Sequence, residues 1–132
     1  MQDYLCELND RQKEAVLHKD GPVMIIAGAG SGKTKVLTTR IAHLMSEHHV
    51  DAFNILALTF TNKAAKEMKE RVENTLGNTD ARSLYIGTFH SVFARILRSE
   101  APRLGYPNNF TIYDTDDAKA VVKTVVNELS LD

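Results

Sequence analysis

Short apolar runs alternate with amphipathic segments along most of this 132-residue chain. Each run is too short for a helix, and the stretch that follows it has apolar residues at helical spacing. The predicted strands are residues 23–27, 55–60 and 84–88, and the predicted helices after them are residues 33–47, 63–76 and a segment that begins at Phe89. Three strand–helix units in succession predict an α/β fold with a parallel sheet and right-handed crossovers.

The two ends of the chain carry different patterns. Near the start, Asn9 and Gln12 have the spacing of a capping box and predict a helix that runs to about His18. After Gly105 a polar loop leads to a predicted helix cap at Asp114, and an amphipathic helix that needs a partner surface follows. Its apolar stripe comprises Ala118, Val121, Val122, Val125, Val126 and Leu129.

Composition narrows the class of protein. With 43% hydrophobic and 25% charged residues, the chain has the content of one globular domain. It has no apolar stretch near the roughly 20 residues that span a bilayer, and its start does not resemble a signal peptide. The single cysteine, Cys6, forms no internal disulfide, and His48 and His49 have no spaced partners for a metal site. We therefore expect a cytoplasmic protein.

The net charge of −1 hides a gradient along the chain. Residues 33–103 hold 11 Lys and Arg against seven Asp and Glu, an excess of +4, whereas the segments before and after them are acidic. This excess is a mild sign of a polyanionic partner, far from the charge of a basic nucleic-acid tail.

The first predicted strand and helix are joined by the sequence Ala27-Gly28-Ala29-Gly30-Ser31-Gly32-Lys33-Thr34. In this context the glycines let backbone N–H groups surround phosphate oxygens, and the helix N-terminus adds partial positive charge. As the expected catalytic residues, Lys33 reaches the β- and γ-phosphates of ATP and the Thr34 hydroxyl binds Mg²⁺. Ala27 replaces the usual first glycine and leaves the three glycines to shape the turn. A glycine-rich turn with a chance lysine is the weaker alternative.

Hydrolysis also needs a carboxylate to complete the Mg²⁺ site and another to orient the attacking water. The candidates are Asp114, Asp116 and Asp117, which follow a short apolar run. Acidic residues at the start of a helix are ordinary caps, and we prefer that interpretation. The catalytic carboxylates are therefore expected from a second chain, unless the sequence is a fragment of a longer protein.

Gln12 has two interpretations. Locally, it is the glutamine of the capping box that begins with Asn9. Functionally, a side-chain amide both donates to and accepts from an adenine edge, which suits base recognition just before a phosphate loop. The two roles are expected to need different rotamers.

Hydroxyl, aromatic and basic side chains cluster where the second and third predicted strands end. The two clusters are Thr59-Phe60-Thr61-Asn62-Lys63 and Thr88-Phe89-His90-Ser91. Ligands of parallel sheets bind at the carboxyl ends of the strands, so both clusters should share one edge with the glycine loop. Such mixtures bind single-stranded nucleic acid through phosphate hydrogen bonds, base stacking and charge. Core packing is the alternative for each phenylalanine taken alone.

These segments together resemble the UvrD/Rep/PcrA-type superfamily 1A DNA helicases. The matching motifs are Leu8-Asn-Asp-Arg-Gln12 (Q motif), residues 27–34 (motif I), Leu58-Thr-Phe-Thr-Asn-Lys-Ala-Ala65 with Glu67-Met68 (motif Ia) and Gly87-Thr-Phe-His-Ser91 (motif Ib). The resemblance implies a P-loop, RecA-like core that hydrolyses ATP with Mg²⁺, moves 3′-to-5′ along single-stranded DNA and unwinds duplexes. It assigns residues 1–113 to the first core domain, 1A, and residues 114–132 to the start of an inserted helical subdomain, 1B.

The resemblance also implies residue roles. Gln12 would contact adenine, the loop from Ala27 to Thr34 would hold the phosphates and Mg²⁺, and Lys35 and Arg40 would add nucleotide contacts from the following helix. The implied DNA track comprises Thr59, Phe60, Thr61, Asn62, Thr88, Phe89 and His90. The implied partners are single-stranded and junction DNA and the remaining helicase domains.

The family's acidic motif, its later DNA-contacting motifs, its arginine finger and its second motor domain have no counterpart in the sequence. We therefore expect an amino-terminal fragment with weak or no ATP binding, no significant hydrolysis and no unwinding. An incomplete sheet predicts marginal stability or self-association through residues 121–129. The alternatives are the helicase subunit of a RecB- or AddA-like helicase–nuclease, a non-catalytic nucleotide-dependent binding module, and a small P-loop kinase.

Overall fold

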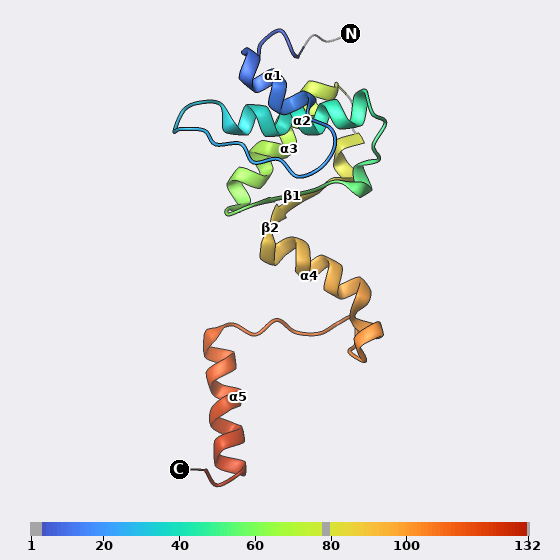
Figure 1. Ribbon diagram of the computed structural model, residues 1–132. Coiled ribbons are helices and arrows are strands. Elements are labelled where there is room, and N and C mark those ends of the chain that lie inside the picture. The colour runs from blue at the N-terminus through green and yellow to red at the C-terminus, as the bar shows by residue number, and fades with distance from the viewer. Residues whose placement is uncertain (1–3, 78–79, 132) are drawn as a thin grey trace. The chain divides into compact units, whose positions relative to one another are not determined.

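A computed structural model describes residues 4–77 and 80–131 of the chain (Figure 1). The chain divides into two compact units, Met1–Phe93 and Ala94–Asp132, and each is described by itself. The boundary falls before residue 113, so the division between subdomains 1A and 1B stays a prediction. Among the described residues, no helix combines the length and the apolar character that crossing a membrane requires.

The sheet of the first unit has two parallel strands, β1 (Leu56–Thr59) and β2 (Tyr85–Thr88). Helix α3 (Asn62–Leu76) connects them, as the strand–helix–strand pattern predicted. Leu56 pairs with Tyr85 at one end of the ladder, and Thr59 pairs with Thr88 at the other. Because the two strands run in register, the two polar clusters begin side by side at one edge of the sheet (Figure 1).

Helix α3 begins and ends as its sequence predicted. The Thr61 hydroxyl accepts a hydrogen bond from the Ala64 N–H at 3.1 Å and caps the first turn. Gly77 ends the helix with φ +67°, a left-handed conformation that glycine adopts without steric cost. The predicted continuation at Asn78 lies outside the described residues.

The core of the first unit lies between the sheet and two of its helices. The larger cluster joins helix α2 (Lys33–Ser46) to β1, α3 and the segment before β2 through Ile41, Ala57, Met68, Val72, Ala81 and Leu84. A smaller cluster packs helix α1 (Asp10–Leu17) on α2 through Leu8, Val16 and Val36. Helix α2 belongs to both clusters, so the core fixes the segment that follows the glycine loop.

The predicted first strand is not formed. Residues 23–27 are extended but pair with neither β1 nor β2, and Met24 and Ile26 are 85% and 90% exposed. A strand is held by hydrogen bonds to a neighbour. Residues 23–27 make no such bonds to β1 or β2, and most of their apolar side chains are exposed. The sheet therefore has two strands where three were predicted.

The helix after β2 is confirmed, but most of its apolar face is exposed. Helix α4 (Phe89–Glu100) buries Val92, whereas Phe89, Phe93 and Leu97 are exposed among the described residues. Val92 lies so close to Gly87 that a Cβ on the glycine would be 2.7 Å from the valine Cγ2. The start of α4 is thus packed tightly against β2, and this contact reaches no further along the face.

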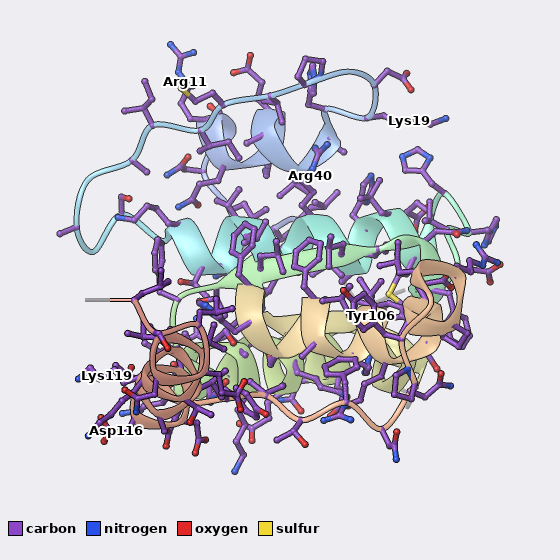
Figure 2. The ribbon with its side chains drawn as sticks, turned by 90° about the horizontal axis from the view of Figure 1, so that it is seen from below. Arg11, Lys19, Arg40, Tyr106, Asp116 and Lys119 are labelled. Atoms are coloured by element: carbon purple, nitrogen blue, oxygen red, sulfur yellow. The ribbon has the colours of Figure 1, made fainter. Side chains whose placement is uncertain are left out.

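The second unit contains a loop and helix α5 (Thr115–Glu128). The Arg98 guanidinium lies 4.9 Å from the centre of the Phe110 ring and donates to the carbonyls of Asn108 and Phe110, so it holds the loop. Asp114 caps α5 as predicted. Figure 2 shows Asp116 and Lys119 on the surface of α5, where they form an exposed ion pair at 3.6 Å. The predicted apolar stripe is also exposed, except for the partly buried Val126.

Candidate functional site

The glycine loop is closed on itself by its own side chains. Gly30 and Gly32 have φ angles of +74° and +86°, which is why these positions suit glycine. The Lys33 ammonium donates to the carbonyls of Ala27 at 3.2 Å and Gly28 at 2.6 Å, and the Ser31 hydroxyl donates to the same Gly28 carbonyl at 2.7 Å. The lysine is exposed, so an anion at the loop can attract it away from these neutral carbonyls.

Gln12 joins the start of α1 to this loop. Its Oε1 accepts from the Asn9 N–H at 3.0 Å, while the Asn9 side chain accepts from the Gln12 N–H at 2.9 Å, so the predicted capping box is formed. In the same rotamer, Nε2 of Gln12 donates to the Ser31 carbonyl at 3.0 Å. One rotamer of Gln12 thus serves both the capping box and the glycine loop, and its contact with adenine stays a prediction.

Gln12 and the loop line one cavity of about 300 Å³. Its wall comprises Asn9, Arg11, Gln12, Ala15, Ile25, Ile26, Ala27, Gly28, Ser31, Lys33 and Val36. Apolar side chains with a few placed polar groups are the usual lining of a small-molecule site, and the volume is at the lower end of such sites. Ile25 and Ile26 were predicted to lie in a buried strand. An apolar run in the sequence does not show that its side chains line a cavity.

Thr34 carries the hydroxyl that the sequence predicts to bind Mg²⁺, and this role stays a prediction. It is the second residue of α2 and is exposed beside the loop. A hydroxyl is a hard donor that suits Mg²⁺, which otherwise keeps water and phosphate oxygens as ligands. Among the described residues, no three His, Cys, Asp or Glu side chains gather as a metal site. The residues present therefore fit Mg²⁺ as the companion of a bound phosphate.

The acidic candidates of the second unit are caps, as preferred from the sequence. The Asp114 carboxylate accepts from the N–H groups of Asp116 and Asp117, both at 2.9 Å. The Asp117 carboxylate in turn accepts from the Asp114 N–H at 3.2 Å, which completes a second capping box.

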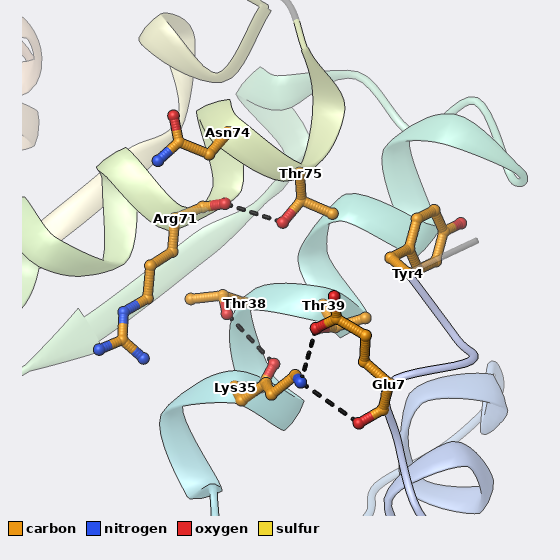
Figure 3. Close-up of a pocket in the computed structure, with 8 residues that line it drawn as sticks. All are labelled: Tyr4, Glu7, Lys35, Thr38, Thr39, Arg71, Asn74 and Thr75. Atoms are coloured by element: carbon orange, nitrogen blue, oxygen red, sulfur yellow. Dashed lines mark hydrogen bonds and ion pairs between the residues drawn. The ribbon is translucent and has the colours of Figure 1, made fainter. Parts of the chain in front are cut away.

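Lys35, a predicted nucleotide contact, is held by Glu7. Its ammonium lies 2.8 Å from the Glu7 carboxylate and 3.2 Å from the Glu7 carbonyl (Figure 3). The hydrogen bond and charge of Lys35 lower the pKa of the Glu7 carboxyl. Both side chains line a different, polar cavity of about 460 Å³, together with Tyr4, Thr38, Thr39, Arg71, Asn74 and Thr75.

Arg40, the other predicted contact on α2, caps the end of α1. Its guanidinium donates to the carbonyl of Ala15 at 2.9 Å and to the carbonyl of His18. Figure 2 shows Arg40 between α1 and α2. Sequence reasoning missed this role because the sequence does not show which distant side chain will bind the last carbonyl groups of a helix. The nucleotide-binding roles of Lys35 and Arg40 stay predictions.

The side chains of the two polar clusters differ in their hydrogen-bond partners and in their exposure. The hydroxyls of Thr61 and Thr88 accept from backbone N–H groups at the starts of α3 and α4. The Phe60 ring is fully exposed, which removes the core-packing alternative for it. Phe89 stacks on Phe93, with ring centres 5.7 Å apart and planes 13° apart. Asn62 and His90 are exposed beside these rings in sequence, and Thr59 is partly buried at the end of β1.

Known proteins match almost the whole chain. Residues 8–132 match the UvrD/REP helicase N-terminal domain family. A protein named ATP-dependent DNA helicase PcrA from Bacillus subtilis is 56% identical over 128 residues, which cover 97% of this chain and 17% of that protein. PcrA from a Staphylococcus aureus strain is 51% identical over 132 residues, 100% of this chain and 18% of its own length. The chain thus spans less than a fifth of these relatives, and it belongs to the UvrD/REP helicase N-terminal domain family.

Proposed function

We propose that this chain is the ATP-binding part of the first motor domain of a DNA helicase that moves 3′-to-5′ along single-stranded DNA. The observation that carries the proposal is the cavity where Gln12 meets the phosphate loop, with Lys33 at its wall. The relatives at 51 to 56% identity, whose names state an ATP-dependent DNA helicase, support the same activity for the parent protein.

In this proposal, the residues from Gly30 to Thr34 bind the triphosphate. Lys33 leaves the loop carbonyls for the phosphates, because a charged partner binds an ammonium more strongly than a neutral one does. The Thr34 hydroxyl holds Mg²⁺, which draws negative charge from the phosphate oxygens when it is bound. Gln12 faces the base.

The paired ends of β1 and β2 are proposed to hold single-stranded DNA. Phe60 offers an open face for base stacking, and Thr59 and Thr88 lie at the matched ends of the two strands. The other proposed contacts are Thr61, Asn62, Phe89 and His90. The remaining domains of the longer helicase would supply the catalytic carboxylates. The 132-residue chain alone therefore binds nucleotide weakly and does not hydrolyse it.

Titration of the 132-residue chain with Mg-ATP tests the nucleotide site. We expect saturable binding in the millimolar range by NMR, at least tenfold weaker in Lys33→Ala, because the variant lacks the charge-assisted contact. Lys119→Ala is the matched control, since it removes an exposed lysine from α5, away from the loop in sequence. Equal binding by wild type and Lys33→Ala, or steady ATP turnover by the wild-type chain, would contradict the proposal.

A further inference from the structure

The Gln12 side chain links two backbone segments that are 19 residues apart in sequence. One end of the amide caps α1 through the Asn9 N–H, and the other end holds the Ser31 carbonyl of the phosphate loop. The position of α1 is itself fixed, because Val16 is buried against α2 in the smaller core cluster. The amide therefore extends from a packed helix to the glycine loop and adds a bond to those that the loop makes within itself.

Gly32 makes the close approach of this amide feasible. A Cβ at position 32 would lie 2.9 Å from Nε2 of Gln12, closer than nonbonded atoms allow. The φ of Gly32 is +86°, so the backbone favours glycine, and a Cβ here would also displace the Gln12 amide. Glycine at position 32 therefore leaves room for the Gln12 amide as well as for a phosphate.

Holding the Ser31 carbonyl also sets the direction of a phosphate donor. The Ser31 carbonyl and the Gly32 N–H belong to one planar trans peptide, in which the C=O and N–H bonds point in opposite directions. When Gln12 holds the carbonyl on its own side, the Gly32 N–H must point to the other side. Backbone N–H groups at this point of a glycine loop are the groups that cradle phosphate oxygens.

We propose that Gln12 is a positioning residue for the phosphate loop, acting through the Ser31–Gly32 peptide and independently of any contact with a base. The inference rests on the proposed nucleotide site and deepens it. A glutamine amide has two N–H donors and an oxygen with two lone pairs, and each end uses one of them in the structure. One donor and one acceptor remain, so positioning of the loop does not exclude recognition of adenine.

The test uses inorganic tripolyphosphate, a ligand with the phosphates of ATP and no base. Gln12→Glu keeps an oxygen that accepts from the Asn9 N–H but lacks the donor to Ser31. Gln12→Met has a similar length, is neutral and lacks both groups. We expect tripolyphosphate to bind both variants about three- to tenfold more weakly than wild type, as the loss of one neutral hydrogen bond predicts. The Gly32 amide resonance should shift in both variants before ligand is added.

A matched control separates positioning of the loop from general destabilisation. Val16→Ala weakens the packing of α1 without removing a polar group, and Val16 does not line the cavity. We expect this variant to unfold at a lower temperature but to keep the wild-type affinity for tripolyphosphate at temperatures where it is folded. Gln12→Glu should instead bind tripolyphosphate more weakly even at temperatures where it is fully folded.

Each outcome decides between positioning and its alternatives. If both Gln12 variants bind tripolyphosphate as wild type does and lose affinity for ATP alone, Gln12 recognises the base and the inference is overturned. If only Gln12→Glu loses affinity, the cause is repulsion by the added carboxylate, and the inference is again wrong. If wild type and Lys33→Ala bind tripolyphosphate equally, the proposed nucleotide site fails first and the inference fails with it.

Discussion

Adding one methyl group at Gly87 tests how tightly the start of α4 is packed on strand β2. In Gly87→Ala, the new Cβ would lie 2.7 Å from Oγ of Ser91 and 2.7 Å from Cγ2 of Val92, and both distances are shorter than real Cβ contacts. Gly87 lies in the regular strand β2 and is buried, so backbone conformation is not the source of strain. The helix start must move away from the strand.

The size of the effect follows from the cost of overpacking a core, which is about 1 to 3 kcal/mol per substitution. For a chain of this length each kcal/mol lowers the unfolding midpoint by about 4 °C, so we expect a decrease of about 4 to 12 °C. Differential scanning calorimetry measures it. The double variant Gly87→Ala/Val92→Ala removes one of the two opposing groups and should lose less stability than the sum of the single variants.

A glycine-to-alanine change elsewhere supplies the control for this experiment. Gly28 has no atom within 4 Å of its would-be Cβ and its φ is not left-handed, so Gly28→Ala should not lower the midpoint. An unfolding midpoint of Gly87→Ala within about 1 °C of wild type would refute the packing argument, since it would mean that α4 can move without a loss of folding free energy. Full additivity with Val92→Ala would refute it too.

Further predictions concern the stacking ring and a buried histidine. Phe60→Ala should weaken binding of single-stranded DNA about five- to a hundredfold in fluorescence anisotropy, from about 1 to 3 kcal/mol of base stacking, with an unchanged circular dichroism spectrum because the ring packs on nothing. The pKa of His43 is lowered, first by burial and then by the charge of His48, so the unfolded chain takes up its proton at higher pH than the folded chain does. Stability should be full above a pH of about 6.5 and fall as the pH drops below it, and His43→Gln should make denaturation midpoints less dependent on pH.

Sequence reasoning was successful where a signal is local. The capping box of Asn9 and Gln12 and the C-cap at Gly77 each depend on residues within one helical turn, and each is formed. The parallel pairing of β1 with β2 agrees with the succession of strand–helix units, which predicted a parallel sheet.

The failures concern features that depend on distant partners. Residues 23–27 have the apolar content of a buried strand, but a strand also needs a neighbour, and none of the described strands fills that place. The face of α4 is open beyond Val92 for the same reason. Arg40 and Lys35 could not be placed because their partners, the end of α1 and Glu7, are 20 or more residues away in sequence.

The same distinction applies to the candidate site. The phosphate loop could be located from its spacing, whereas the bond from Gln12 to Ser31 could not, because nothing in the spacing sets the distance between α1 and the loop. Capping and recognition of adenine were the two roles predicted for Gln12, and a contact with the loop was not predicted. In the structure, the amide oxygen serves the cap and the amide nitrogen contacts the loop.

Helix α1 is attached at both ends, by Gln12 to the glycine loop before α2 and by Arg40 to α2 itself. A helix of eight residues is too short to persist alone in water. Its helicity therefore depends on these two attachments and on Val16. Amide hydrogen exchange along α1 becomes a reporter of what happens at the loop, so that ligand occupancy can be followed through protons that never contact the ligand.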